Sequence, residues 1–414
     1  MNLKKNYLKK SADILFLIQI FTLPFFVEHI SNILIIITTC LYILSTERIN
    51  KPDKLFLFLL FPMIKFVGIF YSDYIPIVEN TQIFLDKYIV YIFYFICFIY
   101  VDKHQFNNLK TFFILGTLFT LITSFSYNFI LSINVGDFNI ENFIYHKLLS
   151  LYGLHSSYFS LYLLISLIFL LNNKTIIGIY RIISIVLIII GLILLESRII
   201  TISAFLCLLF LMFKYVRTHK NKNIILFGFI SVSLLVIFTI PQDYKKRFEQ
   251  IYNFDSKKLI GGNYENGVTQ RVFLWKLGIN ILHDYPLIGV GSNSDQFYLN
   301  KQLEKEINKD IYKPSEIKAI KSYLKRNLNL HNQYLSILVS HGLIGLFCFL
   351  VFMLMPLYVS YKEKNIHILL TQIPLILFCT TENVLLRNKG IMIFAFIYAI
   401  YGFYYFRCLL NEKE

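Results

Sequence analysis

The stretch Leu330-His331-Asn332-Gln333-Tyr334-Leu335 lies where the character of the sequence changes. The segment before it, from about residue 241 to 330, is polar and rich in lysine, whereas residues 335–360 form an apolar run. An apolar run of about 17 residues or more can cross a lipid bilayer as a helix, which satisfies its own backbone hydrogen bonds. The stretch therefore predicts a membrane helix with a histidine and an asparagine at its mouth, beside a large polar loop.

The composition of the whole chain is typical of a membrane protein. Of its 414 residues, 56% are hydrophobic and only 16% are charged, whereas about a quarter are charged in soluble domains. We expect an all-α polytopic membrane protein with about twelve transmembrane helices and one large extracytoplasmic loop. The predicted spans are 12–28, 30–46, 54–71, 84–101, 111–132, 154–171, 176–195, 198–213, 223–240, 335–360, 366–386 and 390–409.

The predicted organisation has three parts: the first nine helices in residues 1–240, the loop in 241–334, and the last three helices in 335–414. Most Lys and Arg of the short connections fall on one side, which is taken as cytoplasmic. This places both termini in the cytoplasm and the loop on the outer face. Within the loop we expect two helices, at about 270–284 with Thr269 as N-cap and at about 315–326 with Ser315 as N-cap.

The net charge of +15 indicates a lipid bilayer as partner rather than nucleic acid, because basic residues of cytoplasmic loops face anionic lipid. The six cysteines all lie in apolar runs, so neither a disulfide nor a zinc site is predicted. The sequence has no phosphate-binding loop, dinucleotide fingerprint or zinc-protease motif. Acidic residues of the outer segments share no common spacing, so no metal or other cofactor is expected.

Three ionisable residues at predicted outer helix ends are candidates for catalysis, because lipid alone would not select them there. Imidazole titrates near neutral pH, so His331 could be a general base, or an interfacial histidine bonded to backbone. Arg198, in the tight turn Glu196-Ser197-Arg198, could hold a phosphate or pair with Glu196. Arg271 lies near the start of a loop helix and opposes its dipole, which favours an anionic partner, although a solvated arginine fits as well.

Other polar residues at the same face are candidates for substrate binding. Asn332 follows His331, and His155 and Tyr158 lie at the start of another predicted outer helix. Glu382 and Arg387 cluster with Lys389 at a further outer turn, where a Glu–Arg pair that only supports the turn is the alternative.

Several of these segments together resemble the O-antigen ligase/polymerase superfamily. Its members show a His-Asn-x-x-Leu stretch followed by Gly-x-x-Gly. The matching segments are His331-Asn332-Gln333-Tyr334-Leu335, His341-Gly342-Leu343-Ile344-Gly345-Leu346, Arg271 to Trp275 with Pro286-Leu287-Ile288-Gly289-Val290-Gly291, Ser197-Arg198, Glu382-Asn383 and Lys389-Gly390. The chain departs from the pattern at Ile199, where the family usually has glycine, and at His341, where many members have an acidic residue.

The resemblance implies an integral glycosyltransferase of the GT-C type in the bacterial inner membrane. Such enzymes take a glycan from a polyprenyl (undecaprenyl) diphosphate carrier, without nucleotide sugar or metal. It also implies that His331 activates the acceptor hydroxyl and that Arg198 and Arg271 hold the diphosphate. Fixed arginines would stabilise charge on that leaving group, and a base on the opposite face would give inversion.

The acceptor decides between several functions that share this donor. Our first interpretation is an O-antigen ligase that transfers the glycan to lipid A–core or a similar acceptor. A surface-polysaccharide polymerase and a protein O-oligosaccharyltransferase use the same donor chemistry and stay open. A lipid-linked glycan transporter, the alternative from another class, would show two related halves, and no such repeat is evident.

Overall fold

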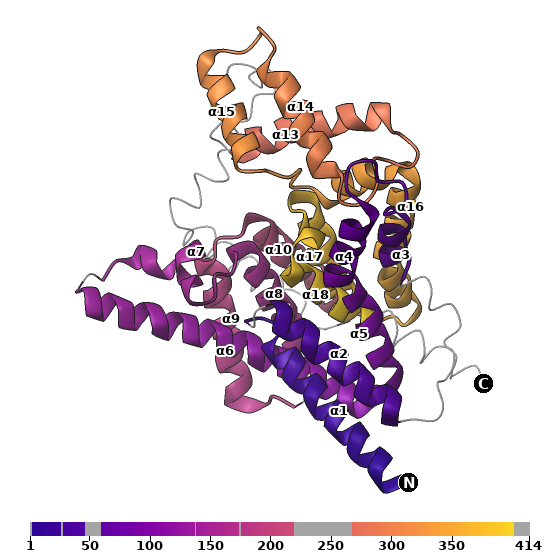
Figure 1. The fold of residues 1–414 in the computed structure, drawn as a ribbon. Coiled ribbons are helices and arrows are strands. Elements are labelled where there is room, and N and C mark those ends of the chain that lie inside the picture. The colour runs from indigo at the N-terminus through magenta and orange to yellow at the C-terminus, as the bar shows by residue number, and fades with distance from the viewer. Residues whose placement is uncertain are drawn as a thin grey trace.

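The computed structural model describes residues 2–25, 28–45, 59–136, 138–173, 175–218 and 267–400. Every regular element in these ranges is a helix (Figure 1). The elements are α1 (Asn2–Thr22), α2 (Glu28–Ser45), α3 (Leu60–Val67), α4 (Ile77–Lys87), α5 (Ile89–Tyr100), α6 (Lys103–Val135), η2 (Ile140–Phe143), α7 (Tyr145–Leu148), η3 (Ser150–Tyr152), α8 (Ser156–Leu171), α9 (Gly178–Leu194), α10 (Arg198–Thr218), α13 (Gly267–Asp284), α14 (Asp295–Ile307), α15 (Pro314–Lys325), α16 (Gln333–Lys362), α17 (Ile366–Thr381), η5 (Val384–Leu386) and α18 (Asn388–Tyr398).

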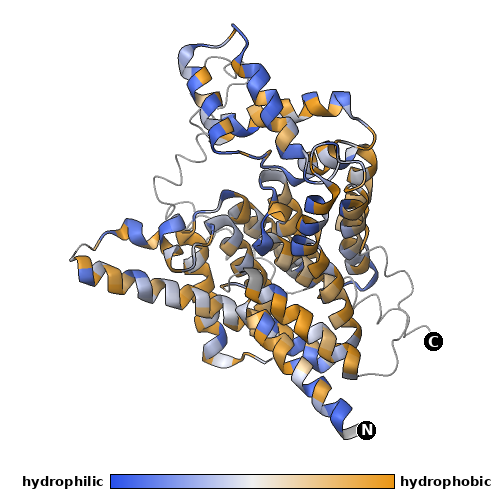
Figure 2. Ribbon diagram, viewed as in Figure 1, coloured by the Kyte–Doolittle hydropathy of each residue, from blue (hydrophilic) through white to orange (hydrophobic). Residues whose placement is uncertain are grey.

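The helices form a large bundle with a small cap at one end. Helices α13, α14 and α15 make the cap, and the N-terminus of the chain lies at the opposite end of the bundle (Figure 1). Figure 2 shows that α14 and α15 are more hydrophilic than the bundle. The cap has an apolar core of its own, in which Leu277, Leu303 and Ile320 bring its three helices together. We call the bundle end that faces these helices the cap end.

The bundle has the length and apolar character of a membrane protein. Among the residues that the structure describes, three helical segments are long and apolar enough to cross a membrane: Ile77–Tyr100, His104–Val135 and Gln333–Lys362. The shorter apolar helices are Ile30–Ser45, Ser156–Leu171, Gly178–Leu194, Ile366–Thr381 and Asn388–Tyr398. The expected all-helical membrane architecture is therefore found, whereas about twelve spans remain a prediction from run length. The predicted span 223–240, parts of 54–71 and 390–409, and residues 241–266 of the loop lie outside the described residues.

The cap differs from its prediction in detail. Helix α13 begins at Gly267, so the expected cap Thr269 lies inside its first turn, and it ends at Asp284 as predicted. Helix α15 begins at Pro314, with Lys313 rather than Ser315 at its N-cap. Helix α14 was not predicted, because its sequence is strongly charged and only a few apolar residues face the cap core.

Helix α16 is broken at Gly342, where the loop after α13 inserts. The φ and ψ angles of Gly342 are 63° and −163°, a conformation that is open essentially to glycine alone. Around the break, four backbone hydrogen bonds join the helix to the loop. These are Leu343 N–H to Pro286 O at 3.0 Å, Ile344 N–H to Leu287 O at 3.2 Å, Val290 N–H to Val339 O at 3.0 Å and Gly291 N–H to Ser340 O at 2.9 Å. The first part of α16 is thereby fixed to the cap.

Candidate active site

His331 lies two residues before the start of α16, next to its N-cap Asn332, in a left-handed backbone conformation. Its φ is 48°, which costs a residue other than glycine about 1–2 kcal/mol. The Asn329 side-chain oxygen accepts the His331 N–H at 2.9 Å, and Trp275 of α13 donates from Nε1 to the Leu330 carbonyl at 2.8 Å. These contacts hold a conformation that directs the imidazole to Glu382, whose Oε2 lies 3.3 Å from His331 Nδ1. Strained residues of this kind cluster at functional sites.

Glu382 joins the bundle to the cap. It follows α17, and its other oxygen, Oε1, accepts a hydrogen bond from Arg271 Nη2 of α13 at 2.9 Å. Burial alone would raise the pKa of Glu382, but the hydrogen bond from His331 and the charges of Arg271, His331 and His155 outweigh it and hold that pKa below its ordinary 4.5. Glu382 is therefore ionised at neutral pH.

This charge state fixes the proton on the imidazole. An ionised carboxylate can only accept hydrogen bonds, so His331 Nδ1 carries the proton toward Glu382. In neutral histidine the other nitrogen, Nε2, is then an acceptor, and it makes no hydrogen bond to a described residue. Arg271 has an anionic partner within the protein, and that partner is Glu382. Glu382 pairs with Arg271 instead of Arg387, the pairing considered from the sequence.

Asn332 has a structural task that the sequence did not separate from substrate binding. Its Oδ1 accepts the Leu335 N–H at 3.0 Å and so caps α16. The Asn332 N–H donates to Asn383 Oδ1 at 2.8 Å, and Gln333 Oε1 accepts the Leu385 N–H at 2.8 Å. The start of α16 is thus bonded to the connection between α17 and α18.

His155, Tyr158 and Arg387 also lie at that connection. The His155 ring packs edge-on against Tyr158, with centroids 5.8 Å apart. Tyr158 donates to the Asn383 carbonyl at 3.4 Å, and the Arg387 guanidinium lies 5.8 Å from the Tyr158 ring centroid. His155 is close enough to Glu382, Arg387 and His331 to interact electrostatically with all three, so the candidates cluster.

His146 also belongs to this cluster, although nothing in the sequence distinguishes it from other histidines. Its ring centroid is 4.4 Å from that of His155, and its Nδ1 accepts the Ser156 N–H at 3.2 Å. It lies in α7, a single turn with no periodic pattern to mark it. Proximity to His155 through folding is the only signal, and a single sequence does not carry that signal.

Arg198 is the first residue of α10, and the packing of α10 locates it. Cys207 of α10 donates to the Leu370 carbonyl of α17 at 3.4 Å, and Lys214 interacts electrostatically with His367 near the start of α17. Helices α10 and α17 are therefore antiparallel. The Arg198 end of α10 accordingly lies at the end of α17 that leads into Glu382.

Four helices begin around these residues: α8, α10, α16 and α18. None has an acidic residue in its first turn. A helix N-terminus carries a partial positive charge and unpaired N–H groups, so it attracts anions. Arg198, Arg271 and Arg387 add positive charge to these termini. The acidic residues of the same region are Glu382, which contacts His331, and Glu196, which is buried two residues before Arg198.

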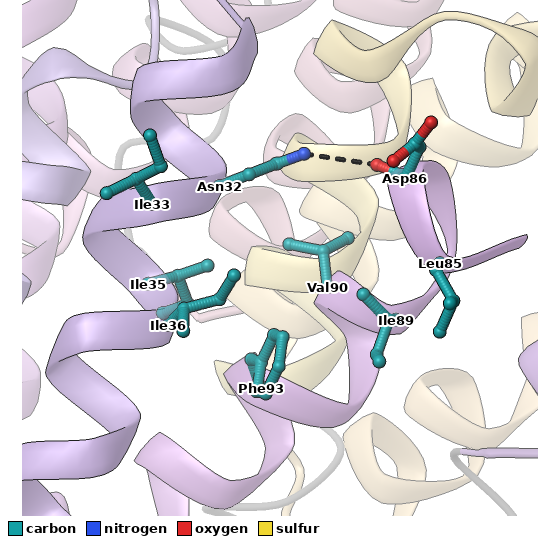
Figure 3. A pocket seen from close by; sticks show the side chains of 9 residues that line it. All are labelled: Asn32, Ile33, Ile35, Ile36, Leu85, Asp86, Ile89, Val90 and Phe93. Carbon is teal, nitrogen blue, oxygen red and sulfur yellow. Dashed lines mark hydrogen bonds between the residues drawn. The ribbon is translucent and has the colours of Figure 1, made fainter. Parts of the chain in front are cut away.

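A groove of about 200 Å³ lies elsewhere, between α2 and the α4–α5 pair (Figure 3). Isoleucines of α2 face Val90 and Phe93 of α5, and Asn32 donates to the Asp86 carbonyl at 3.1 Å at its polar end. None of the candidate residues lines it. In the part of the chain that the structure describes, no three His, Cys, Asp or Glu residues are grouped so that they could hold a metal ion.

A comparison with known families was made for the whole chain. Residues 183–350 match the model of a family described as O-antigen ligase. This match confirms the resemblance to the O-antigen ligase/polymerase superfamily that the sequence predicted. The O-antigen ligase match contains Arg198, Arg271 and His331, whereas Glu382 and His155 lie outside it.

A relative was also found among curated proteins. An uncharacterized protein of Haemophilus influenzae is 25% identical to this chain, over a region that covers 42% of this chain and 43% of the relative. The match spans less than half of that protein's length, and its name assigns no activity.

Proposed function

We propose that this protein is an O-antigen ligase that transfers a glycan from a polyprenyl diphosphate carrier to an acceptor such as lipid A–core. The observation that carries the proposal is the chain of contacts Arg271–Glu382–His331, at a place where four helix N-termini meet. The family match supports this class of enzyme.

The positive charge at these helix N-termini supports an anionic donor. A diphosphate leaving group accumulates negative charge on its oxygens, and fixed donors stabilise that charge more in the transition state than water does. Arg271 donates one hydrogen bond to Glu382, so the other N–H groups of its planar guanidinium can bind phosphate oxygens. Arg198 and the N-termini of α8 and α10 supply further positive potential. We assign the diphosphate to this region, without a metal ion.

His331 would act as the base. The acceptor hydroxyl gives its proton to Nε2, and its oxygen forms a bond to the anomeric carbon. The bond from that carbon to the diphosphate oxygen breaks, and the diphosphate leaves with the electron pair. Glu382 holds the imidazole in the required tautomer and stabilises the imidazolium that forms, as the carboxylate does in a serine-protease triad. Attack opposite the leaving group inverts the anomeric carbon.

The membrane orientation is part of the proposal. We assign the cap end to the periplasmic face of the inner membrane, with both termini in the cytoplasm. The separation of the N-terminus from the cap (Figure 1) supports this orientation. A polyprenyl tail would then enter from the lipid between helices, and the glycan would remain in water near the cap.

His331→Ala tests the function. We expect this variant to fold in the membrane and to transfer no glycan, so that the carrier-linked donor accumulates. The matched control is His104→Ala, because His104 is an exposed histidine at the first turn of α6, away from the candidate residues. Normal transfer by the His331 variant would refute the catalytic assignment.

The product pattern on a gel identifies the acceptor class. Loss of all long chains on lipid A–core, with polymerised glycan still on the carrier, indicates a ligase. Persistence of single-repeat products indicates a polymerase instead. Loss of glycan from a protein acceptor would point to an O-oligosaccharyltransferase. A carrier-linked glycan that fails to reach the outer face would favour the transporter.

A further inference from the structure

The surroundings of His155 contain polar atoms that the proposed reaction does not use. Within the described residues, His155 Nδ1, Ser156 Oγ and Asn383 Nδ2 are buried and make no hydrogen bond. Ser156 and Asn383 are almost wholly buried, at 0% and 2% exposed. Buried polar groups in proteins usually have a partner. Because these three atoms are closed off from solvent, His155 Nδ1 cannot be the atom that meets a substrate, which leaves Nε2.

His155 itself is only partly buried, and its position determines its tautomer. A buried N–H without an acceptor is rarer than an acceptor without a donor. Nδ1, which is buried with no partner, is therefore the unprotonated nitrogen, and Nε2 carries the proton. The neighbouring His146 uses its Nδ1 to accept the Ser156 N–H. His155 thus offers a hydrogen-bond donor from Nε2.

His155 is also uncharged at neutral pH. Burial lowers its pKa to about 4, Glu382 acts in the opposite direction, and His146, Arg387 and His331 lower it further. An imidazole with so low a pKa is a poor general base at neutral pH. Because it stays neutral, it adds nothing to the positive charge that favours the diphosphate. What His155 can supply to a substrate is an uncharged hydrogen-bond donor, Nε2–H, close to His331 and Arg387.

We propose that His155 is a specificity residue that donates a hydrogen bond from Nε2 to an uncharged sugar oxygen, a ring hydroxyl or an amide carbonyl, next to the diphosphate. The inference rests on the proposed glycosyltransferase function. That sugar belongs either to the donor, as the residue attached to the carrier, or to the acceptor, and both present the same chemistry to His155. A site built to hydrogen-bond a substrate oxygen discriminates strongly, because an unpaired buried donor is costly.

Three variants of His155 separate these roles. Glutamine carries its amide nitrogen about as far from Cα as Nε2 of histidine, asparagine about as far as Nδ1, and leucine carries none. We expect His155→Leu and His155→Asn to raise KM about tenfold to a hundredfold for one substrate, the size of one lost hydrogen bond. His155→Gln should recover most of that loss, and the pH profile of kcat should stay as in wild type. His104→Leu is the matched control.

The KM values for both substrates are then measured with purified enzyme, undecaprenyl diphosphate-linked glycan and acceptor. They show whether His155 contacts the sugar of the donor or that of the acceptor. A raised KM for the donor places His155 on the donor sugar, and a raised KM for the acceptor places it on the acceptor sugar. Equal losses in the Gln and Asn variants would overturn the proposal, as would a fall in kcat with a changed pH profile and unchanged KM values. If the Leu variant does not fold, the comparison of Gln with Asn still decides.

A binding measurement separates failure of this inference from failure of the function. Thermal stabilisation of wild-type protein is measured with bare undecaprenyl diphosphate and with undecaprenyl diphosphate-linked glycan. If His155 contacts the donor sugar, the Asn variant keeps the response to the bare carrier and loses the extra response to the glycan. A normal extra response, together with a normal acceptor KM, would refute the role of His155 alone. No response of wild type to either compound, with no transfer, would overturn the proposed function as well.

Discussion

The replacement of Glu382 by glutamine should test the proposed site most directly. The carboxylate has two oxygens, and each accepts from a different partner: Arg271 Nη2 at 2.9 Å and His331 Nδ1 at 3.3 Å. Glutamine has the same length but only one acceptor oxygen, and its amide nitrogen is a donor. In Glu382→Gln, the amide nitrogen faces either Arg271, which has no acceptor, or His331 Nδ1, where it favours the tautomer with the proton on Nε2. In both cases the negative charge between the two groups is lost.

The geometry sets the size of the expected effect. The Glu382 side chain is 13% exposed, so water replaces its contacts poorly. General-base catalysis contributes about 10²–10⁴ in rate, and replacement of the orienting carboxylate in a serine-protease triad lowers kcat about 10⁴-fold. The contact from His331 to Glu382 is longer than an ideal charged hydrogen bond of about 2.7–2.9 Å. We therefore expect a smaller fall in kcat, about 100- to 1,000-fold, and a smaller rise in donor KM.

The assay is glycan transfer by purified protein in liposomes, with the melting temperature measured in parallel. The matched control is Glu141→Gln, because Glu141 pairs with Lys147 at 3.0 Å but is 67% exposed, and exposed pairs contribute about 0–1 kcal/mol. Glu141→Gln should keep both activity and stability. Wild-type kcat in Glu382→Gln would refute the role of the carboxylate. A loss of activity that only follows a loss of folded protein would refute it as well.

Three further predictions concern other parts of the molecule. Arg198→Lys and Arg271→Lys keep the charge but lose the planar fork, so each should lower transfer about tenfold or more in the same assay; full activity would exclude contact of the fork with phosphate. Gly342→Ala should reduce the yield of folded protein and its melting temperature. The φ of Gly342 is 63°, and an added Cβ would lie 2.2 Å from the Leu287 carbonyl. A normal melting temperature would contradict this explanation of the break in α16. In the folded state the pKa of His155 is about 4, whereas an unfolded histidine takes up its proton near pH 6.5. The stability of the wild type should therefore fall as the pH is lowered from 6.5 to 4. The melting temperature should show a smaller fall over this range in His155→Gln.

The sequence predicted the class of architecture because that information is local. Long apolar runs, few charges and the change of character at Leu330 are visible within single windows. The prediction of Thr269 as N-cap was wrong because helix α13 begins three residues earlier, at Gly267, where Gly267 and Val268 give no start signal. Helix α14 was missed because most of its residues are polar or charged and only a few apolar residues face the cap core. Helix ends and short amphipathic helices depend on what packs against them.

The candidate site shows a similar division between local and tertiary information. His331, Arg271 and Glu382 were each selected from the sequence, since each is an ionisable residue at an outer helix end. Their mutual contacts could not be predicted, because 111 residues separate Arg271 from Glu382 and 51 separate His331 from Glu382. The sequence pointed instead to the nearer Arg387. When the fold is unknown, a pair between neighbours in the sequence is the simplest prediction for Glu382. In the folded protein, tertiary packing brings Arg271 to Glu382 instead.

The break in α16 explains why two distant glycine-containing motifs occur in the same chain. Gly342 stops the helix, and the Pro286–Gly291 loop takes over the hydrogen bonds that the stop would leave unmade. Asp295, at the start of α14, then accepts a hydrogen bond from Ser336 at 2.7 Å, one turn after Asn332. The short helical part between Asn332 and Gly342 is therefore held by the cap at both ends and in the middle. Because His331 directly precedes this part and Arg271 lies in the cap itself, both groups that bind Glu382 are positioned by the cap. The distance from base to carboxylate is consequently set by how the cap sits on the connection between α17 and α18, and not by the loop around His331 alone.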